Sequence, residues 1–357
     1  MKNCLVIVKN KKLNNDFSVA EEISRAFSSG CYYFDKTAII AYDESLAITA
    51  QAKDTFDNYD NAVFVCGSAQ TQALRKYLSE LYSSPFDSAN IINASGKTVA
   101  LVSEEEEIKT KCGLIVSLLN EKYNVSYDKM YVKCVGAPAE TINNAISQSL
   151  KLTAEMTFAV FDDYGDQTIE ITYSSNTPKM VTDGVLRILT SNLEDYIYAF
   201  EDISLAQRLY QLLKLRRMKI SIAESFTGGG ICKKLVEVPG VSEVFVEGLN
   251  TYSNLSKIKR LGVSELTLKQ YGAVSDETAF QMADGLIKTG DCDVSVATTG
   301  IAGPKSDNTS KPVGLAYIAV GLKEQVSVYK FNFKGDRDAI TKTAINRALF
   351  LVYKTLK

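Results

Sequence analysis

The sequence contains no histidine among its 357 residues. Without an imidazole side chain, a Ser-His-Asp triad, a Cys-His dyad and the usual histidine-bearing catalytic zinc sites are all excluded. Any hydrolytic reaction in this protein must therefore take its base from lysine, glutamate, aspartate or tyrosine.

The sequence also lacks an excess of positive charge. Lys and Arg number 40 against 42 Asp and Glu, for a formal net charge of -2, so little is present to neutralise a phosphate backbone. The apolar run Leu5–Val8 is too short for the core of a signal peptide, and no later run approaches the ~20 apolar residues of a membrane span. We therefore expect a cytoplasmic protein that binds neither nucleic acid nor membrane.

Paired cysteines are missing as well. The seven cysteines are odd in number and scattered singly, with no CxxC pair, which argues against a disulfide framework and a zinc knuckle. We expect reduced and mostly buried thiols at Cys4, Cys31, Cys66, Cys112, Cys134, Cys232 and Cys292.

The length predicts two or three domains, at roughly 100 to 200 residues per domain, and the pattern is that of an α/β protein. In residues 1–130, apolar strands at Leu5–Val8, Ala62–Val65 and Thr98–Val102 alternate with helix-like stretches. Residues 131–200 predict a small α+β domain, with helices near 140–150 and 181–190 and strands near 156–161 and 168–172.

Residues 201–357 predict an α/β layered domain whose functional loops follow its strands. The Ser204-x-x-Gln207 pattern is typical of a helix start, and Ser275 is placed to cap a second helix. Strands are predicted at 218–222, 294–296 and 314–320, and the last helix spans about 340–351.

The first of these loops places Ser225 at a strand end, before three glycines that begin a helix. Ser225 could be a nucleophile beside an oxyanion hole formed by amides near Thr227, Gly228 and Gly229. The alternatives are a phosphate-binding loop, or a tight turn in which Ser225 caps the helix. Taken alone, the segment favours these alternatives.

The second loop contains Tyr252 and Lys257. If Ser253 or Asn254 caps the next helix, Lys257 lies in its first turn, where the helix dipole and any burial favour the neutral amine. A neutral Lys257 could deprotonate Ser225. The alternatives are a surface lysine and a tyrosine that packs in the core, but the absence of histidine strengthens the lysine hypothesis.

Two further segments carry candidate binding groups. The segment from Thr298 to Pro304 offers hydroxyls and close backbone to a carboxamide or a phosphate, or it is a plain turn imposed by Gly303-Pro304. Arg337 precedes the last helix and could clamp a phosphate, although a surface ion pair with Asp336 is as good an interpretation.

Together these stretches resemble the C-terminal domain of the CinA family, the competence/damage-inducible proteins. The resemblance lies in motifs that occur in order: 223–229 (AESFTGG), 238–240 (VPG), 251–254 (TYSN) with Lys257, 261–263 (LGV), 271–275 (YGAVS), 299–304 (TGIAGP), 311–314 (KPVG) and 335–337 (GDR). The chain departs from the family at Phe226, where cysteine is usual. It also has Lys305-Ser306-Asp307 where a Gly-Gly pair is usual.

The resemblance implies an amidase that hydrolyses nicotinamide mononucleotide to nicotinic acid mononucleotide and ammonia, without metal or cofactor, and that forms a homodimer. It makes Ser225 the nucleophile, Lys257 its base and Tyr252 a supporting hydroxyl. The residues that it places around the substrate are Thr227, Gly228, Asn254, Thr299, Gly300, Ala302 and Gly303, to which we add Gly229 and Arg337.

The first 130 residues occupy the place of the family's molybdopterin-binding-like domain. They lack its Gly-Gly-x-Gly-Pro-Thr loop and have Cys66-Gly67-Ser68-Ala69-Gln70-Thr71 instead, so we expect a divergent domain that serves as a scaffold. Two other functions stay open. One is a catalytically silent nucleotide-binding or regulatory protein, and the other is a bifunctional enzyme that also cleaves ADP-ribose.

Overall fold

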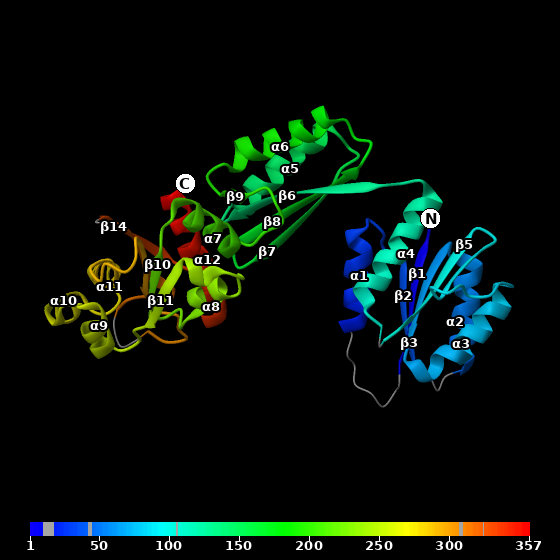
Figure 1. Cartoon of the computed structure of the whole chain (residues 1–357), viewed down its shortest axis with the longest axis horizontal. Helices are drawn as coiled ribbons and strands as arrows, with labels where there is room; N and C mark the ends of the chain where they lie inside the picture. The colour runs from blue at the N-terminus through cyan, green and yellow to red at the C-terminus, as the bar shows by residue number, and fades with distance from the viewer. Residues whose placement is uncertain (10–17, 42–44, 105, 307–309, 324) are drawn as a thin grey trace. The chain divides into compact units, whose positions relative to one another are not determined.

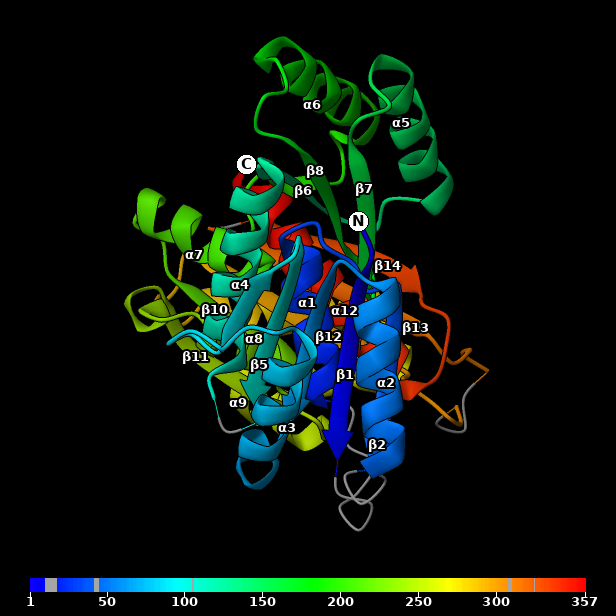
Figure 2. The same ribbon diagram turned by 90° about the vertical axis from the view of Figure 1, so that its right-hand side faces the viewer.

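The structure, a computed structural model, describes residues 1–9, 18–41, 45–104, 106–306, 310–323 and 325–357. The chain divides into two compact units (Figures 1 and 2). Unit 1 comprises residues 1–128 and 174–176, and unit 2 comprises residues 129–173 and 177–357. The predicted α/β class is confirmed by alternating helices and strands in both units. The predicted domain boundaries at about 130 and 200 stay predictions.

Unit 1 is built on a five-stranded sheet of order β2-β1-β3-β5-β4, in which only β4 runs antiparallel to its neighbour. Its strands are β1 (Asn3–Lys9), β2 (Lys36–Ala41), β3 (Asn61–Cys66), β4 (Ile91–Ala94) and β5 (Lys97–Ser103). The helices are α1 (Ser18–Ser29), α2 (Ser45–Asn58), α3 (Ser68–Leu81) and α4 (Ile108–Tyr123).

Helices cover both faces of this sheet. Successive residues of β1 point to opposite sides, so that Val6 packs with α2 and α3 while Leu5 and Ile7 pack with α1 and α4. Burial on both faces explains why the predicted central strands are continuous apolar runs. The segment after Cys66, which replaces the family's glycine loop, begins α3 at Ser68.

Unit 2 contains most of a four-stranded sheet of order β7-β8-β6-β9, backed by two helices that pack side by side on it (Figure 1). The strands are β6 (Tyr127–Val135), β7 (Thr157–Asp163), β8 (Asp166–Ser174) and β9 (Ile197–Ala199). The helices are α5 (Ala139–Leu152) and α6 (Lys179–Leu193), close to the predicted ranges.

The rest of unit 2 is a five-stranded sheet of order β11-β10-β12-β13-β14, parallel over the first three strands and antiparallel over the last two. Its strands are β10 (Ile220–Glu224), β11 (Phe245–Asn250), β12 (Val294–Gly300), β13 (Leu315–Leu322) and β14 (Gln325–Asn332).

Two groups of helices sandwich this sheet. One face is covered by α7 (Leu205–Arg216), α8 (Gly230–Val236) and α12 (Arg337–Leu356), with the short 3-10 turn η1 (Val241–Glu243) beside them. The other is covered by α9 (Asn254–Leu261), α10 (Glu265–Tyr271) and α11 (Asp276–Ile287).

The predicted helix starts are confirmed. The hydroxyls of Ser204, Ser253 and Ser275 each accept a hydrogen bond from a backbone amide in the first turn of α7, α9 and α11. The cap at Ser253 fixes the start of α9 and therefore the position of Lys257 one turn later.

Within unit 2, a buried asparagine joins α12 to the turn between β7 and β8. The side-chain amide of Asn346 donates to the carbonyl oxygens of Asp163 (2.8 Å) and Tyr164 (3.2 Å), and its oxygen accepts from Lys234 of α8 (2.7 Å). All of its polar groups are thus satisfied away from water. No helix in the described part of the chain is long and apolar enough to cross a membrane.

Candidate active site

Ser225 directly follows β10, and the turn from Phe226 to Gly229 leads into α8. Gly228 (φ 63°) and Gly229 (φ 96°) both have left-handed backbone angles, which glycine adopts without steric cost. Gly230 has another role: a Cβ there would clash with Ile345 of α12. The glycines thus shape the turn and let α8 pack closely on α12.

The preceding residue, Glu224, is completely buried and turns its carboxylate onto the start of α8. It accepts the amide hydrogens of Gly229 (3.0 Å), Ile231 (3.2 Å) and Cys232 (2.9 Å). The positive end of the helix is therefore neutralised by the chain's own anion. This argues against the phosphate-binding-loop alternative, because three of the amides at the start of α8 are already occupied.

The same loop contacts exclude two of the amides that were expected to form the oxyanion hole. The amide of Gly229 donates to Glu224, and that of Gly228 donates to the carbonyl oxygen of Ser225 (3.2 Å). In the described part of the chain, the amides of Phe226 and Thr227 donate to no acceptor.

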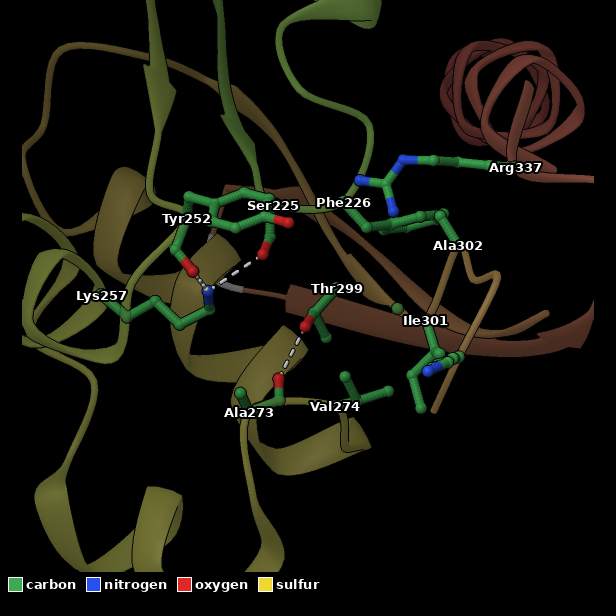
Figure 3. A pocket seen from close by; sticks show the side chains of 12 residues that line it. Ser225, Phe226, Tyr252, Lys257, Ala273, Val274, Thr299, Ile301, Ala302 and Arg337 are labelled. Atoms are coloured by element: carbon green, nitrogen blue, oxygen red, sulfur yellow. Dashed lines mark hydrogen bonds between the residues drawn. The ribbon is translucent and has the colours of Figure 1, made fainter. Parts of the chain in front are cut away.

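Lys257 reaches Ser225 from α9. Its Nζ donates to Ser225 Oγ (3.0 Å) and to the carbonyl oxygens of Thr251 (2.7 Å) and Tyr252 (3.2 Å), as Figure 3 shows for Ser225 and Tyr252. The residue is 1% exposed, so the alternative of a surface lysine is wrong. None of these partners is a carboxylate, and burial lowers the pKa of Lys257 to about 8.

This geometry suits a neutral amine. An uncharged amine has two N–H groups and one lone pair, and the two carbonyl oxygens can accept both hydrogens. In this neutral state the hydrogen bond to Ser225 reverses its direction, and the lone pair of the amine accepts the hydroxyl hydrogen. The arrangement keeps a proton acceptor beside a nucleophile without any imidazole.

Tyr252 lies at the mouth of the site rather than in the core. Its side chain is 65% exposed, so the core-packing alternative is wrong. Its interaction with Lys257 runs through the main-chain carbonyl. The ring lines the same pocket as Ser225.

These residues open into a pocket of about 240 Å³ at the carboxyl ends of β10, β11 and β12, where ligands bind in open α/β sheets. Of the predicted site residues, Ser225, Lys257, Tyr252, Thr299, Gly300, Ala302 and Arg337 line it. Residues that sequence reasoning missed are Phe226, Ala273, Val274, Ile301 and Lys305.

The other predicted binding residues lie outside the lining. Thr227 shares a buried hydrogen bond with the hydroxyl of Thr298 (2.7 Å), and Asn254 is exposed in the first turn of α9. Gly228 and Gly229 belong to the turn described above. The carbonyl oxygen of Gly303 accepts from Arg337 Nη1 (2.6 Å).

Arg337 begins α12 and points its guanidinium toward Ala302 and Phe226 (Figure 3). Among the described residues Arg337 forms no ion pair with Asp336, which was the alternative interpretation; Asp336 instead caps α12 by accepting the amide hydrogen of Ala339 (2.9 Å). Nearby, Thr299 Oγ1 donates to the carbonyl oxygen of Ala273 (2.6 Å). Asp307, in the segment that departs from the family pattern, lies outside the described residues.

No three acidic or cysteine side chains of the described residues come close enough to hold a metal ion. The fold and the pocket define an α/β domain with a serine at the end of β10 and a buried lysine of α9 beside it.

Comparison with known proteins shows which family this domain resembles. The CinA C-terminal domain family matches residues 202–356, which therefore belong to the CinA family. Competence-damage inducible proteins of Caldicellulosiruptor saccharolyticus and Clostridium beijerinckii are 38% and 37% identical over 248 and 241 residues. These matches cover 66% and 67% of this chain but only 60% and 59% of the relatives, so the chain spans about 60% of their length.

A solved structure of the competence/damage inducible protein CihA from Agrobacterium tumefaciens is also similar. It is 36% identical and has a TM-score of 0.41. The match covers 43% of this chain and 93% of that one.

The hydrogen bonds that Glu224 accepts from the start of α8, here called the Glu224 clamp, can be tested by the stability of the protein. Glu224→Gln keeps the shape but loses the charge and turns donors toward backbone N–H groups, so the free energy of unfolding should fall by about 2 kcal/mol. Urea denaturation of the purified protein measures this change. Glu237→Gln, at the exposed end of the same helix, is the matched control and should be neutral. Equal stability of the two variants would contradict the clamp.

Proposed function

We propose that residues 202–356 hydrolyse the carboxamide of nicotinamide mononucleotide, giving nicotinic acid mononucleotide and ammonia. The observation that carries the proposal is the 3.0 Å contact between Lys257 Nζ and Ser225 Oγ in a site without carboxylate partners for the lysine. The nature of the substrate rests on the motifs that resemble the CinA family, which carries this activity.

In the first step, the neutral amine of Lys257 takes the hydroxyl proton as Ser225 Oγ attacks the carboxamide carbon. A new C–O bond forms, and the carbonyl electron pair moves to the oxygen. When the tetrahedral intermediate collapses, the ammonium of Lys257 returns the proton to the leaving nitrogen and ammonia departs. Water then attacks the acyl-enzyme with the same lysine as base, which regenerates Ser225 and releases the carboxylate.

The oxyanion needs donors that no other acceptor uses. The amides of Phe226 and Thr227 meet this requirement among the described residues, and they directly follow the nucleophile in the chain. We therefore assign the oxyanion hole to these two amides rather than to those of Gly228 and Gly229.

The pocket supports a pyridine nucleotide as ligand. Phe226 and Ile301 offer apolar surface to the ring, and Thr299 offers a hydroxyl near it. Arg337 lines the same cavity and carries the charged fork that phosphate recognition favours. The reaction requires neither a metal nor a cofactor. A homodimer and a cytoplasmic location stay predictions.

The role of Ser225 predicts that Ser225→Ala loses at least about 10³-fold in turnover, because the covalent path needs this hydroxyl. Ammonia release from nicotinamide mononucleotide measures the rate. Ser242→Ala, at an exposed serine of η1, should keep the wild-type rate. Near-normal turnover by a folded Ser225→Ala protein would remove the serine from the reaction.

The role of Lys257 predicts a pH profile. Because the neutral amine is the base, kcat should rise with pH through about 8 and level off above it, following the lowered pKa of Lys257. Lys257→Arg keeps the positive charge but stays protonated at all working pH values, so it should be nearly inactive. A Lys257→Arg protein with the wild-type rate and profile would mean that another group is the base.

A further inference from the structure

The pocket is lined by basic side chains without any acidic one. Among its described lining residues, Lys257, Lys305 and Arg337 are basic, and none is Asp or Glu. A cleft with charge of one sign attracts a ligand of the opposite sign. The pocket therefore favours an anionic ligand, and its three cations differ in how available they are to such a ligand.

Lys257 is not available to a distant anion. All three of its contacts run to Ser225 and to the carbonyl oxygens of Thr251 and Tyr252. Arg337 uses Nη1 for the carbonyl oxygen of Gly303, which orients the guanidinium but leaves its other N–H groups for a ligand. Lys305 is exposed and has no hydrogen-bond or ion-pair partner among the described residues.

The two helix starts nearest Ser225 do not compete for the anion. Glu224 takes the amides of Gly229, Ile231 and Cys232 at α8, and the hydroxyl of Ser253 takes an amide at α9. Among the basic side chains that line the pocket, Lys305 and Arg337 are therefore the two that are left for the negative end of a ligand.

We propose that Lys305 is a specificity-determining residue: with Arg337 it forms a two-cation subsite for a phosphomonoester dianion. A single guanidinium can compensate one negative charge of such a group, and a second cation compensates the other. Lys305 thereby favours a phosphorylated nucleoside over the same nucleoside without phosphate. Lys305 stands where the family pattern has glycine, so its added contribution to phosphate binding is particular to this chain. The proposal rests on the proposed function for the chemistry of the amide end.

Binding measurements test the proposal without turnover. All proteins carry Ser225→Ala, so that no substrate is consumed, and the Ser225→Ala protein itself is the parent. Calorimetry with nicotinamide mononucleotide and nicotinamide riboside compares this parent with the variants that add Lys305→Gln or Lys305→Arg. Lys151→Gln, an exposed lysine of α5, is the control for loss of one charge. Inorganic phosphate serves as a competitor.

We expect Lys305→Gln to weaken mononucleotide binding about five- to tenfold and to leave riboside binding unchanged. Lys305→Arg should restore most of the affinity, and Lys151→Gln should change neither ligand. The mononucleotide affinity of the parent should fall with salt more steeply than that of Lys305→Gln. Phosphate should compete less well against Lys305→Gln.

Equal mononucleotide affinity of the parent and Lys305→Gln would overturn the proposal, and so would equal losses for mononucleotide and riboside. Failure of the proposed function would look different. In that case the wild type releases no ammonia, while the Lys305-dependent preference for the phosphorylated ligand is still measured.

Discussion

The burial of the Lys257 amine without a carboxylate partner is the constraint on which the site depends. The amine is held by the carbonyl oxygens of Thr251 and Tyr252, at the junction between β11 and α9. That junction is fixed to the end of β10, because the amide of Thr251 donates to the carbonyl oxygen of Glu224 (2.8 Å). A carboxylate in the same place would hold the lysine as an ammonium and remove its capacity to accept a proton. The pairing of β10 with β11 is thus what brings a lysine of lowered pKa to Ser225.

The end of β10 combines two tasks in adjacent residues. Glu224 turns inward and stabilises the start of α8, while Ser225 faces the pocket. This division explains why a serine followed by glycines at a helix start does not form a phosphate site here. The helix dipole is used for the fold, and Lys305 and Arg337, the two cations that line the pocket besides Lys257, come from other segments.

Much of the fold could be predicted, because it follows from local signals. The serine caps of α7, α9 and α11 and the apolar central strands carry those signals in a few residues. The prediction missed β2, β4, β9 and β14, which are edge strands: β2 and β14 are only partly buried, and β4 and β9 have four and three residues. Lys257 could be proposed because the sequence has no histidine. Glu224 could not, because a carboxylate that turns back onto the next helix leaves no pattern in the sequence. The exposure of Tyr252 and the approach of Lys305 to the pocket likewise depend on how distant segments fold together.

The most direct test of the central idea is the titration of the Lys257 side chain itself. In protein labelled with ¹³C at lysine Cε, the resonance of Lys257 is identified by its loss in Lys257→Arg, and its shift is followed from pH 6 to 11, a range that spans the ordinary lysine pKa of about 10.4. We predict a midpoint near the lowered pKa of about 8. A midpoint at the ordinary lysine value would contradict the account, because Lys257 would then be almost entirely ammonium even at pH 8, where the lowered pKa leaves about half of it neutral and able to accept the proton of Ser225.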